Sequence, residues 1–148
     1  MSNIINRDTI GDMARRAATK YGDKTAIIFR NIKLSFYDLE REARRFANLM
    51  TRYGVRKGDR VAVYAYNSHY YPISMMGLAK IGAIQVPINY MLNAEEIAFI
   101  INQGRANVLA CTATPLHKRH CRETVRRGQA KGQISDESVR HRCIGVCR

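Results

Sequence analysis

Large aromatic side chains stop abruptly about two thirds of the way along the chain. The eight Tyr and four Phe residues all occur at or before Phe99, and the 148-residue chain has no Trp. A folded domain fills its core with large apolar side chains, so the residues beyond about 112 lack material for a core. The sequence therefore predicts a folded α/β region over residues 1–112, followed by an irregular basic tail over 113–148.

The tail differs from the rest of the chain in its reactive and charged residues. It holds nine Lys/Arg and three Asp/Glu, which gives it a net charge of +6 out of +13 for the whole chain. A disordered, solvated tail or nonspecific polyanion binding fits this charge. Because the tail contains no aromatic side chain on which bases could stack, we expect no specific nucleic-acid partner.

Most cysteine and histidine residues also lie in the tail, which raises the question of zinc. Strong zinc patterns place two close pairs of ligands on either side of a linker. No pair here has C-x-x-C spacing, so we expect reduced thiols and no metal site. The residues concerned are His117, His120, Cys121, His141, Cys143 and Cys147.

Neither a signal peptide nor a membrane span is expected. The first eight residues carry charges where a signal peptide needs an apolar run, and no stretch approaches the roughly 18 apolar residues of a spanning helix. We therefore expect a soluble protein of the cytoplasm.

Apolar periodicity and turn residues predict alternating strands and helices up to residue 111. Ser35 with Asp38, and Asn93 with Glu96, have the spacing of helix-capping pairs, and Ser68 is a third candidate cap. Such alternation predicts a mostly parallel sheet flanked by helices. The expected helices are 9–21, 36–53, 70–81 and 94–103, and the expected strands are 25–29, 33–35, 60–65, 83–88 and 107–111.

The helical spacing also predicts which faces are buried. Helix 70–81 is apolar nearly all round, so we expect it to be buried on more than one side. The other two apolar stripes are Ile10, Met13, Ala14, Ala17, Ala18 and Tyr21 in the first helix, and Phe36, Leu39, Ala43, Phe46, Ala47, Met50 and Tyr53 in the second.

General catalytic signatures are absent from the sequence. There is no G-x-S-x-G or H-E-x-x-H motif, and Gly77 and Gly82 are followed by Ala83 where a phosphate-binding loop needs lysine. We interpret these glycines as helix packing and a helix end. Asp59 and the Glu95–Glu96 pair are interpreted as turn and helix-start residues. The sequence thus predicts no catalytic, cofactor-binding or metal-binding residue.

Several short phrases nevertheless resemble the acyl-adenylate-forming enzymes, specifically the acyl-CoA synthetases (fatty-acid–CoA ligases, AMP-binding enzymes). They occur in the family's order and cover about residues 8–112. The phrases are 23–27 (DKTAI), 34–39 (LSFYDL), 54–62 (GVRKGDRVA), 67–68 (NS), 79–83 (AKIGA), 86–89 (VPIN) and 95–97 (EEI).

The resemblance implies a parent enzyme that uses ATP, Mg²⁺ and coenzyme A. A carboxylic acid is converted to an acyl-adenylate with loss of pyrophosphate, and the thiol of CoA then displaces AMP. In the family, the nucleotide is held by later sequence, beginning with a Ser/Thr/Gly-rich loop that ends in Pro-Lys-Gly. The resemblance stops short of that loop, so it places no family catalytic residue on this chain and implies no cofactor for it.

Three hypotheses follow. The first is a truncated or frameshifted N-terminal fragment of an acid–CoA ligase, inactive by itself, with a frame change near residues 111–116. The second is an interaction module whose basic tail binds polyanions. The third is one subunit of a split ligase whose remainder is a separate chain. The missing layer around helix 70–81 predicts self-association of the isolated chain. The acid is not specified by the residues, although the resemblance favours fatty acids.

Overall fold

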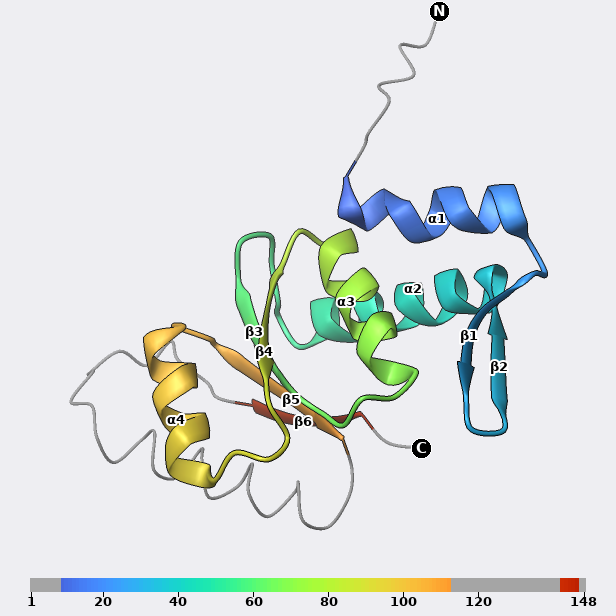
Figure 1. Ribbon diagram of the computed structural model, residues 1–148. Helices are drawn as coiled ribbons and strands as arrows, with labels where there is room; N and C mark the ends of the chain where they lie inside the picture. Colours follow the sequence, from blue (N-terminus) through green and yellow to red (C-terminus); the bar gives the residue numbers. More distant parts are fainter. Residues whose placement is uncertain (1–8, 113–141, 147–148) are drawn as a thin grey trace, which may run out of the picture.

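The computed structural model describes residues 9–112 and 142–146 (Figure 1). All four expected helices and all five expected strands are present, with ends within two residues of the predicted ones. The helices are α1 (Ile10–Tyr21), α2 (Phe36–Arg52), α3 (Tyr70–Lys80) and α4 (Ala94–Gln103). The strands are β1 (Thr25–Phe29), β2 (Ile32–Ser35), β3 (Arg60–Tyr64), β4 (Ile84–Ile88), β5 (Val108–Thr112) and β6 (Arg142–Val146).

The main sheet is parallel throughout, which confirms the predicted fold class. Its strand order is β4-β3-β5-β6, whereas β1 and β2 form a separate antiparallel hairpin (Figure 1). A parallel sheet of this kind needs helical crossovers: α3 connects β3 to β4, and α4 connects β4 to β5.

Strand β6 was not expected, because it falls in the segment predicted to be irregular. It pairs in parallel with β5, and Val108 is opposite Arg142. Aromatic content was the signal for the boundary at residue 112, and a short edge strand needs no aromatic side chain. Residues 113–141 and 147–148 lie outside the described residues, so disorder or a frame change in the tail stays a prediction.

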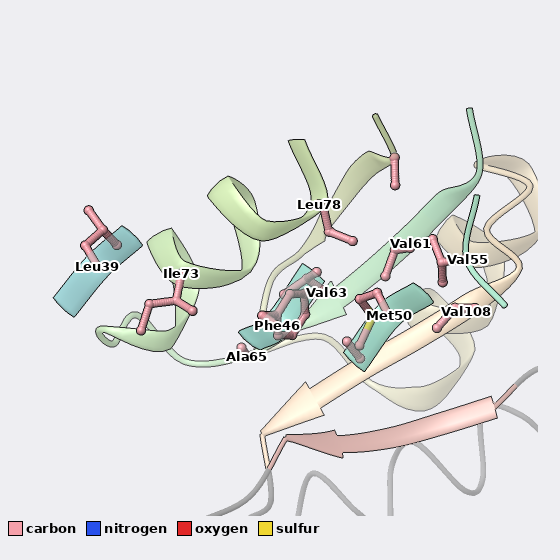
Figure 2. Close-up of a cluster of buried hydrophobic side chains, with 12 residues drawn as sticks. Leu39, Phe46, Met50, Val55, Val61, Val63, Ala65, Ile73, Leu78 and Val108 are labelled. Atoms are coloured by element: carbon pink, nitrogen blue, oxygen red, sulfur yellow. The ribbon is translucent and has the colours of Figure 1, made fainter. Parts of the chain in front are cut away.

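The centre of the sheet is buried on both faces. Val61 and Val63 of β3 contact a core shared with α2 and α3 (Figure 2), whereas Ala62 and Tyr64 contact a second core beneath α4. Successive side chains of a strand point to opposite faces, so a strand covered on both sides has a continuous apolar sequence. The sequence 61–64 (VAVY) has this character, and its residues are at most 3% exposed.

Helix α2 follows its local sequence closely. The Ser35 side chain accepts a hydrogen bond from the Asp38 amide, and the Asp38 carboxylate accepts one from the Ser35 amide. Gly54 follows the helix with a φ of +85°, as expected for a left-handed end. One buried position is wrong: Tyr53 is the C-cap rather than a helical residue and is 39% exposed.

Helix α3 is buried on more than one side, as predicted. Its Ile73 and Leu78 belong to the core shared with α2 and β3, while Met76 contacts Ala14 and Ala43. The predicted cap at Ser68 is wrong, because the N-cap is His69 and no side chain caps the helix. Tertiary packing on several sides of the helix, rather than a side-chain cap at its start, therefore stabilises α3.

The buried stripe of α1 is narrower than its sequence predicts. Ala14 and Ala18 are buried, but Ile10 and Met13 are 63% and 44% exposed. A Cβ added to Gly11 would lie 2.6 Å from the carbonyl oxygen of Ala79, so α1 and α3 are close there. Small residues make this contact, and the larger side chains at the ends of the stripe are left at the surface.

Within residues 9–112 and 142–146, no helix combines the length and apolar character required to cross a membrane.

Candidate functional site

The topology of the sheet singles out the carboxyl ends of β3, β4 and β5. The chain leaves β3 through α3 on one face of the sheet and leaves β4 through α4 on the other. In open α/β sheets, ligands bind outside the carboxyl ends of the strands, where such a change of direction occurs. The connections formed by residues 65–69 and 89–93 lie at this edge.

These two connections are tied together by tyrosines. The buried Tyr64 hydroxyl donates a hydrogen bond to the Tyr90 carbonyl at 3.1 Å, and the rings of Tyr66 and Tyr90 are 4.6 Å apart. Neither connection contains Asp, Glu, Lys or Arg. These two connections therefore present aromatic, amide and imidazole groups, whereas the segment that follows β5 lies outside the described residues.

A hollow of about 310 Å³ lies beside this edge, between β2, α2 and the start of α3. Its apolar lining comes from all three elements, and its polar lining is His69, Glu42 and Arg45. The apolar residues are Leu34, Phe46, Leu49, Tyr70 and Ile73.

His69 is the one histidine of this candidate site. Its ring lies 5.6 Å from the ring of Phe29 and 4.0 Å from that of Tyr70. Its Nδ1 is buried and has no hydrogen-bond partner among the described residues. Burial lowers the pKa of His69 below its ordinary value, so the neutral imidazole is favoured.

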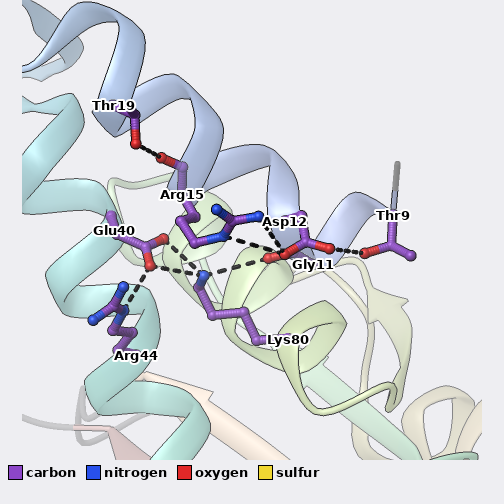
Figure 3. Close-up of polar contacts among 8 residues, drawn as sticks. All are labelled: Thr9, Gly11, Asp12, Arg15, Thr19, Glu40, Arg44 and Lys80. Atoms are coloured by element: carbon purple, nitrogen blue, oxygen red, sulfur yellow. Dashed lines mark hydrogen bonds and ion pairs between the residues drawn. The ribbon is translucent and has the colours of Figure 1, made fainter. Parts of the chain in front are cut away.

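A second polar cluster joins α1, α2 and α3 (Figure 3). Lys80 Nζ lies 2.7 Å from Oε2 of Glu40 and donates hydrogen bonds to Oε1 of Glu40 and to the Gly11 carbonyl. Arg44 Nε donates to Oε1 of Glu40 at 2.7 Å. The side chains of Glu40 and Lys80 are only 9% and 14% exposed. Every buried charge is paired, so this cluster holds helices together and presents no free group for chemistry.

A signal for this cluster is present in the sequence, although no role was predicted for Glu40. Glu40 follows Leu39 and precedes Ala43 and Ala47 by three and seven residues, which places a carboxylate on the buried stripe of α2. No comparable signal marks the hollow at His69, because its walls come from three separate segments.

The residues interpreted as structural in the sequence do have structural contacts. The Asp59 carboxylate accepts a hydrogen bond from the Arg56 amide at 2.7 Å, and Glu96 accepts one from the Asn93 amide at 2.9 Å. A Cβ on Gly77 would lie 2.8 Å from the Ala43 carbonyl oxygen, so this glycine allows α3 to approach α2. Gly82 ends the α3 segment with a φ of +70°.

The histidines and cysteines considered for zinc are not tested by the structure. Five of the six lie outside the described residues, and for Cys143 only the backbone of β6 is described. Among the residues whose side chains are described, no group of three or more His, Cys, Asp or Glu is arranged to hold a metal ion. No metal-dependent step is assigned to the described residues.

Comparison with known proteins gives a consistent family. The family model for the AMP-binding enzyme matches residues 14–144. Crotonobetaine/carnitine–CoA ligases of Salmonella typhi and Salmonella typhimurium are 40% identical over 116 residues, covering 75% of this chain and 22% of theirs. The chain thus spans about a fifth of the length of these curated relatives.

Solved structures agree with the sequence relatives. A putative long-chain-fatty-acid CoA ligase from Rhodopseudomonas palustris is 32% identical, with a TM-score of 0.72, over 93% of this chain and 33% of that one. A Mycobacterium tuberculosis fatty acyl CoA synthetase is 28% identical, with a TM-score of 0.73, over 93% of this chain and 26% of that one. The chain belongs to the AMP-binding enzyme family and corresponds to an N-terminal portion of its acyl-CoA synthetases.

Proposed function

We propose that this chain is the N-terminal α/β part of an ATP-dependent acid–CoA ligase. The complete ligase joins a carboxylic acid to coenzyme A through an acyl-adenylate, with release of pyrophosphate and then AMP. The observation that carries the proposal is the family match over residues 14–144, supported by 40% identity to CoA ligases. Within that enzyme, ATP, Mg²⁺ and CoA are bound mainly by sequence outside this chain.

The acid is proposed to be a fatty acid. The names of two solved relatives that align over 93% of this chain support this choice. The curated relatives are named for crotonobetaine and carnitine instead, so both classes belong in the test. We further propose that the ligase acts in the cytoplasm.

The part played by this chain is to support the fold rather than to carry out the chemistry. The phrases that resemble the family include a helix cap and helix ends, as Ser35, Gly54 and Gly82 illustrate. We therefore propose that the isolated chain catalyses no adenylation, and that it associates with itself or with the remainder of a ligase.

Acid-dependent exchange of pyrophosphate into ATP tests the inactivity of the isolated chain. The purified chain should show no exchange above background with palmitate, crotonobetaine or carnitine. Exchange that depends on any of these acids, and that copurifies with the chain, would show that the chain is itself catalytic.

Co-expression with the remainder of a related ligase tests whether this chain can serve as the N-terminal part of a working enzyme. The remainder of the Rhodopseudomonas palustris enzyme, without the part that this chain matches, is expressed together with this chain. Restored exchange is expected, and a Gly77→Trp variant, which forces α3 away from α2, should not restore it. The enzyme's own N-terminal part is the positive control; if it restores exchange and this chain does not, the proposed function is wrong.

A further inference from the structure

A second hollow, of about 420 Å³, lies between α1 and α2. Its charged lining consists of four arginines and Glu40, whereas the hollow at His69 has one arginine and one glutamate. Ala18, Tyr37 and the stems of the arginines add apolar surface to the walls, so the charged heads are what set this hollow apart. The four residues that define this arginine hollow are Arg15 from α1 and Arg41, Arg44 and Arg45 from α2.

Three of the arginines pair with carboxylates that do not line the hollow. The shortest nitrogen–oxygen distances are 3.2 Å for Arg15, 2.6 Å for Arg41 and 2.7 Å for Arg45. These ion pairs position the arginines without adding negative charge to the walls. The carboxylates belong to Asp12, Asp38 and Glu42.

The one acid of the lining, Glu40, is compensated by two cations. Its carboxylate lies 2.7 Å from Lys80 Nζ and 2.7 Å from Arg44 Nε, and its side chain is only 9% exposed. Figure 3 shows Glu40 between Lys80 and Arg44. The negative charge of Glu40 therefore does little to repel an anion, and the accessible charge of the hollow is positive.

Several hydrogen-bond donors of the hollow are available to a ligand. Arg44 bonds through Nε and Arg45 through Nη1, although a guanidinium carries five N–H donors. The other nitrogens of these two arginines, and the side-chain amide of Asn48, have no hydrogen-bond partner within residues 9–112. The side chains of Arg44 and Arg45 are 63% and 68% exposed, so these donors are reachable from solvent.

We propose that the arginine hollow binds a phosphate group. Arg44 and Arg45 donate hydrogen bonds to its oxygens, and Arg15 adds positive charge from the facing helix. Phosphate oxygens point in several directions and can accept from two helices at once, whereas a carboxylate has two oxygens in one plane. The volume lies in the range of ligand pockets, so the phosphate is part of a diphosphate or a phosphate ester. The proposal depends on the described residues and is independent of the proposed ligase function.

The first test is equilibrium dialysis of the full chain against inorganic pyrophosphate, glycerol 3-phosphate and acetate. EDTA is present so that no metal ion bridges ligand and protein, and salt is kept at about 0.15 M to screen nonspecific attraction. Pyrophosphate should bind at one molecule per chain and at least about tenfold more tightly than acetate. Tighter binding of pyrophosphate than of glycerol 3-phosphate assigns a diphosphate, and the reverse order assigns a phosphate ester. Equal binding of pyrophosphate and acetate, or no saturable binding at millimolar pyrophosphate, would overturn the proposal.

Two arginines of α2 separate a specific site from general positive charge. Arg45→Gln removes one cation of the lining and should weaken pyrophosphate binding about tenfold, the loss expected for one charged hydrogen bond. Its partner Glu42 keeps a contact to Arg41, so this variant should fold. Arg52→Gln is the matched control, because it makes the same change in net charge about 10 Å further along the same helix, beyond the Debye length of about 8 Å. Binding to Arg52→Gln should stay within about twofold of the original, and an equal loss in both variants would reject the site.

A second pair of variants tests the location without removing an arginine. Asn48→Asp places a carboxylate in the lining and should abolish pyrophosphate binding. Asn102→Asp makes the same change in net charge at an exposed position of α4 and should bind as the original chain does. All variants are first compared with the original chain by circular dichroism, so that loss of binding is read only from folded protein. Unchanged binding in folded Asn48→Asp would place the ligand elsewhere and reject the proposal.

Discussion

Helices α2 and α3 are neighbours in the same core, yet they depend on different kinds of interaction. Helix α2 begins with a reciprocal pair of side-chain caps at Ser35 and Asp38 and ends before a left-handed glycine. Helix α3 begins with no side-chain cap, and both Ser68 Oγ and His69 Nδ1 are buried there without a partner. One helix is specified by its own sequence, and the other by what surrounds it.

This difference between the starts of α2 and α3 explains where the candidate site lies. A helix that local interactions already define leaves no polar atom unpaired at its start. A helix formed by burial can tolerate an incompletely satisfied start, because its apolar contacts on several sides supply the stability. The unpaired imidazole nitrogen at the beginning of α3 is the result.

The substitution with the largest expected effect tests how much the stability of the fold depends on the ion pair between α3 and α2. Lys80→Ala removes the partner that α3 offers to the buried Glu40 carboxylate, and should lower the free energy of unfolding by about 3 kcal/mol. Urea denaturation followed by circular dichroism measures this loss. Lys33→Ala, at an exposed position of β2, is the matched control and should change stability by less than about 0.5 kcal/mol. A Lys80 effect as small as the control would mean that water, rather than Lys80, satisfies Glu40.

A smaller effect is expected where the two helices come closest. Gly77→Ala places a Cβ within 2.8 Å of the Ala43 carbonyl and 2.9 Å of the Phe46 ring. Overpacking should outweigh the better helix propensity of alanine and cost about 1–2 kcal/mol in the free energy of unfolding. Met75→Ala, at an exposed site on the same helix, should be nearly neutral in the same denaturation experiment. A stabilised Gly77→Ala variant would show that α3 can move away from α2 freely.

The same substitution at the two helix starts compares them directly. Ser35→Ala removes both hydrogen bonds of the cap hydroxyl and should cost about 1 kcal/mol. Ser68→Ala removes a hydroxyl that has no partner and should leave stability within about 0.5 kcal/mol of the original or raise it slightly. Thermal unfolding of the two variants side by side measures the difference. Equal losses would mean that Ser68 caps α3 in solution after all.

Much of the fold could be predicted from sequence because short-range signals act within one segment. The Ser35–Asp38 and Asn93–Glu96 pairs, the apolar stripe of α2 and the glycine after it each need fewer than 20 residues to be recognised. Burial of Glu40 depends on Lys80, which is 40 residues away, and the walls of the His69 hollow come from three segments. Strand β6 pairs with residues 34 positions earlier, as Val108 does with Arg142, and its short sequence has no aromatic residue to reveal it. Contacts of this kind depend on the folded arrangement rather than on local pattern.

The smallest expected effect is the pH dependence contributed by the start of α3. Burial lowers the pKa of His69 below its ordinary value of 6.5, so the unfolded chain takes up this proton more readily than the folded chain. The contribution of the neutral His69 side chain to the free energy of unfolding is complete above about pH 6.5. It is lost as the pH falls through the pKa of His69 in the folded state. Glu42 and Arg45, which line the same hollow, are paired with each other and do not reverse this direction. The free energy of unfolding of the original chain, compared with that of His69→Phe, should therefore decrease between neutral and mildly acidic pH. The other three histidines are present in both proteins and cancel in the comparison. A difference that stays constant over this range would show that His69 is as well hydrated in the folded chain as in the unfolded one, which would remove the distinction between the starts of α2 and α3.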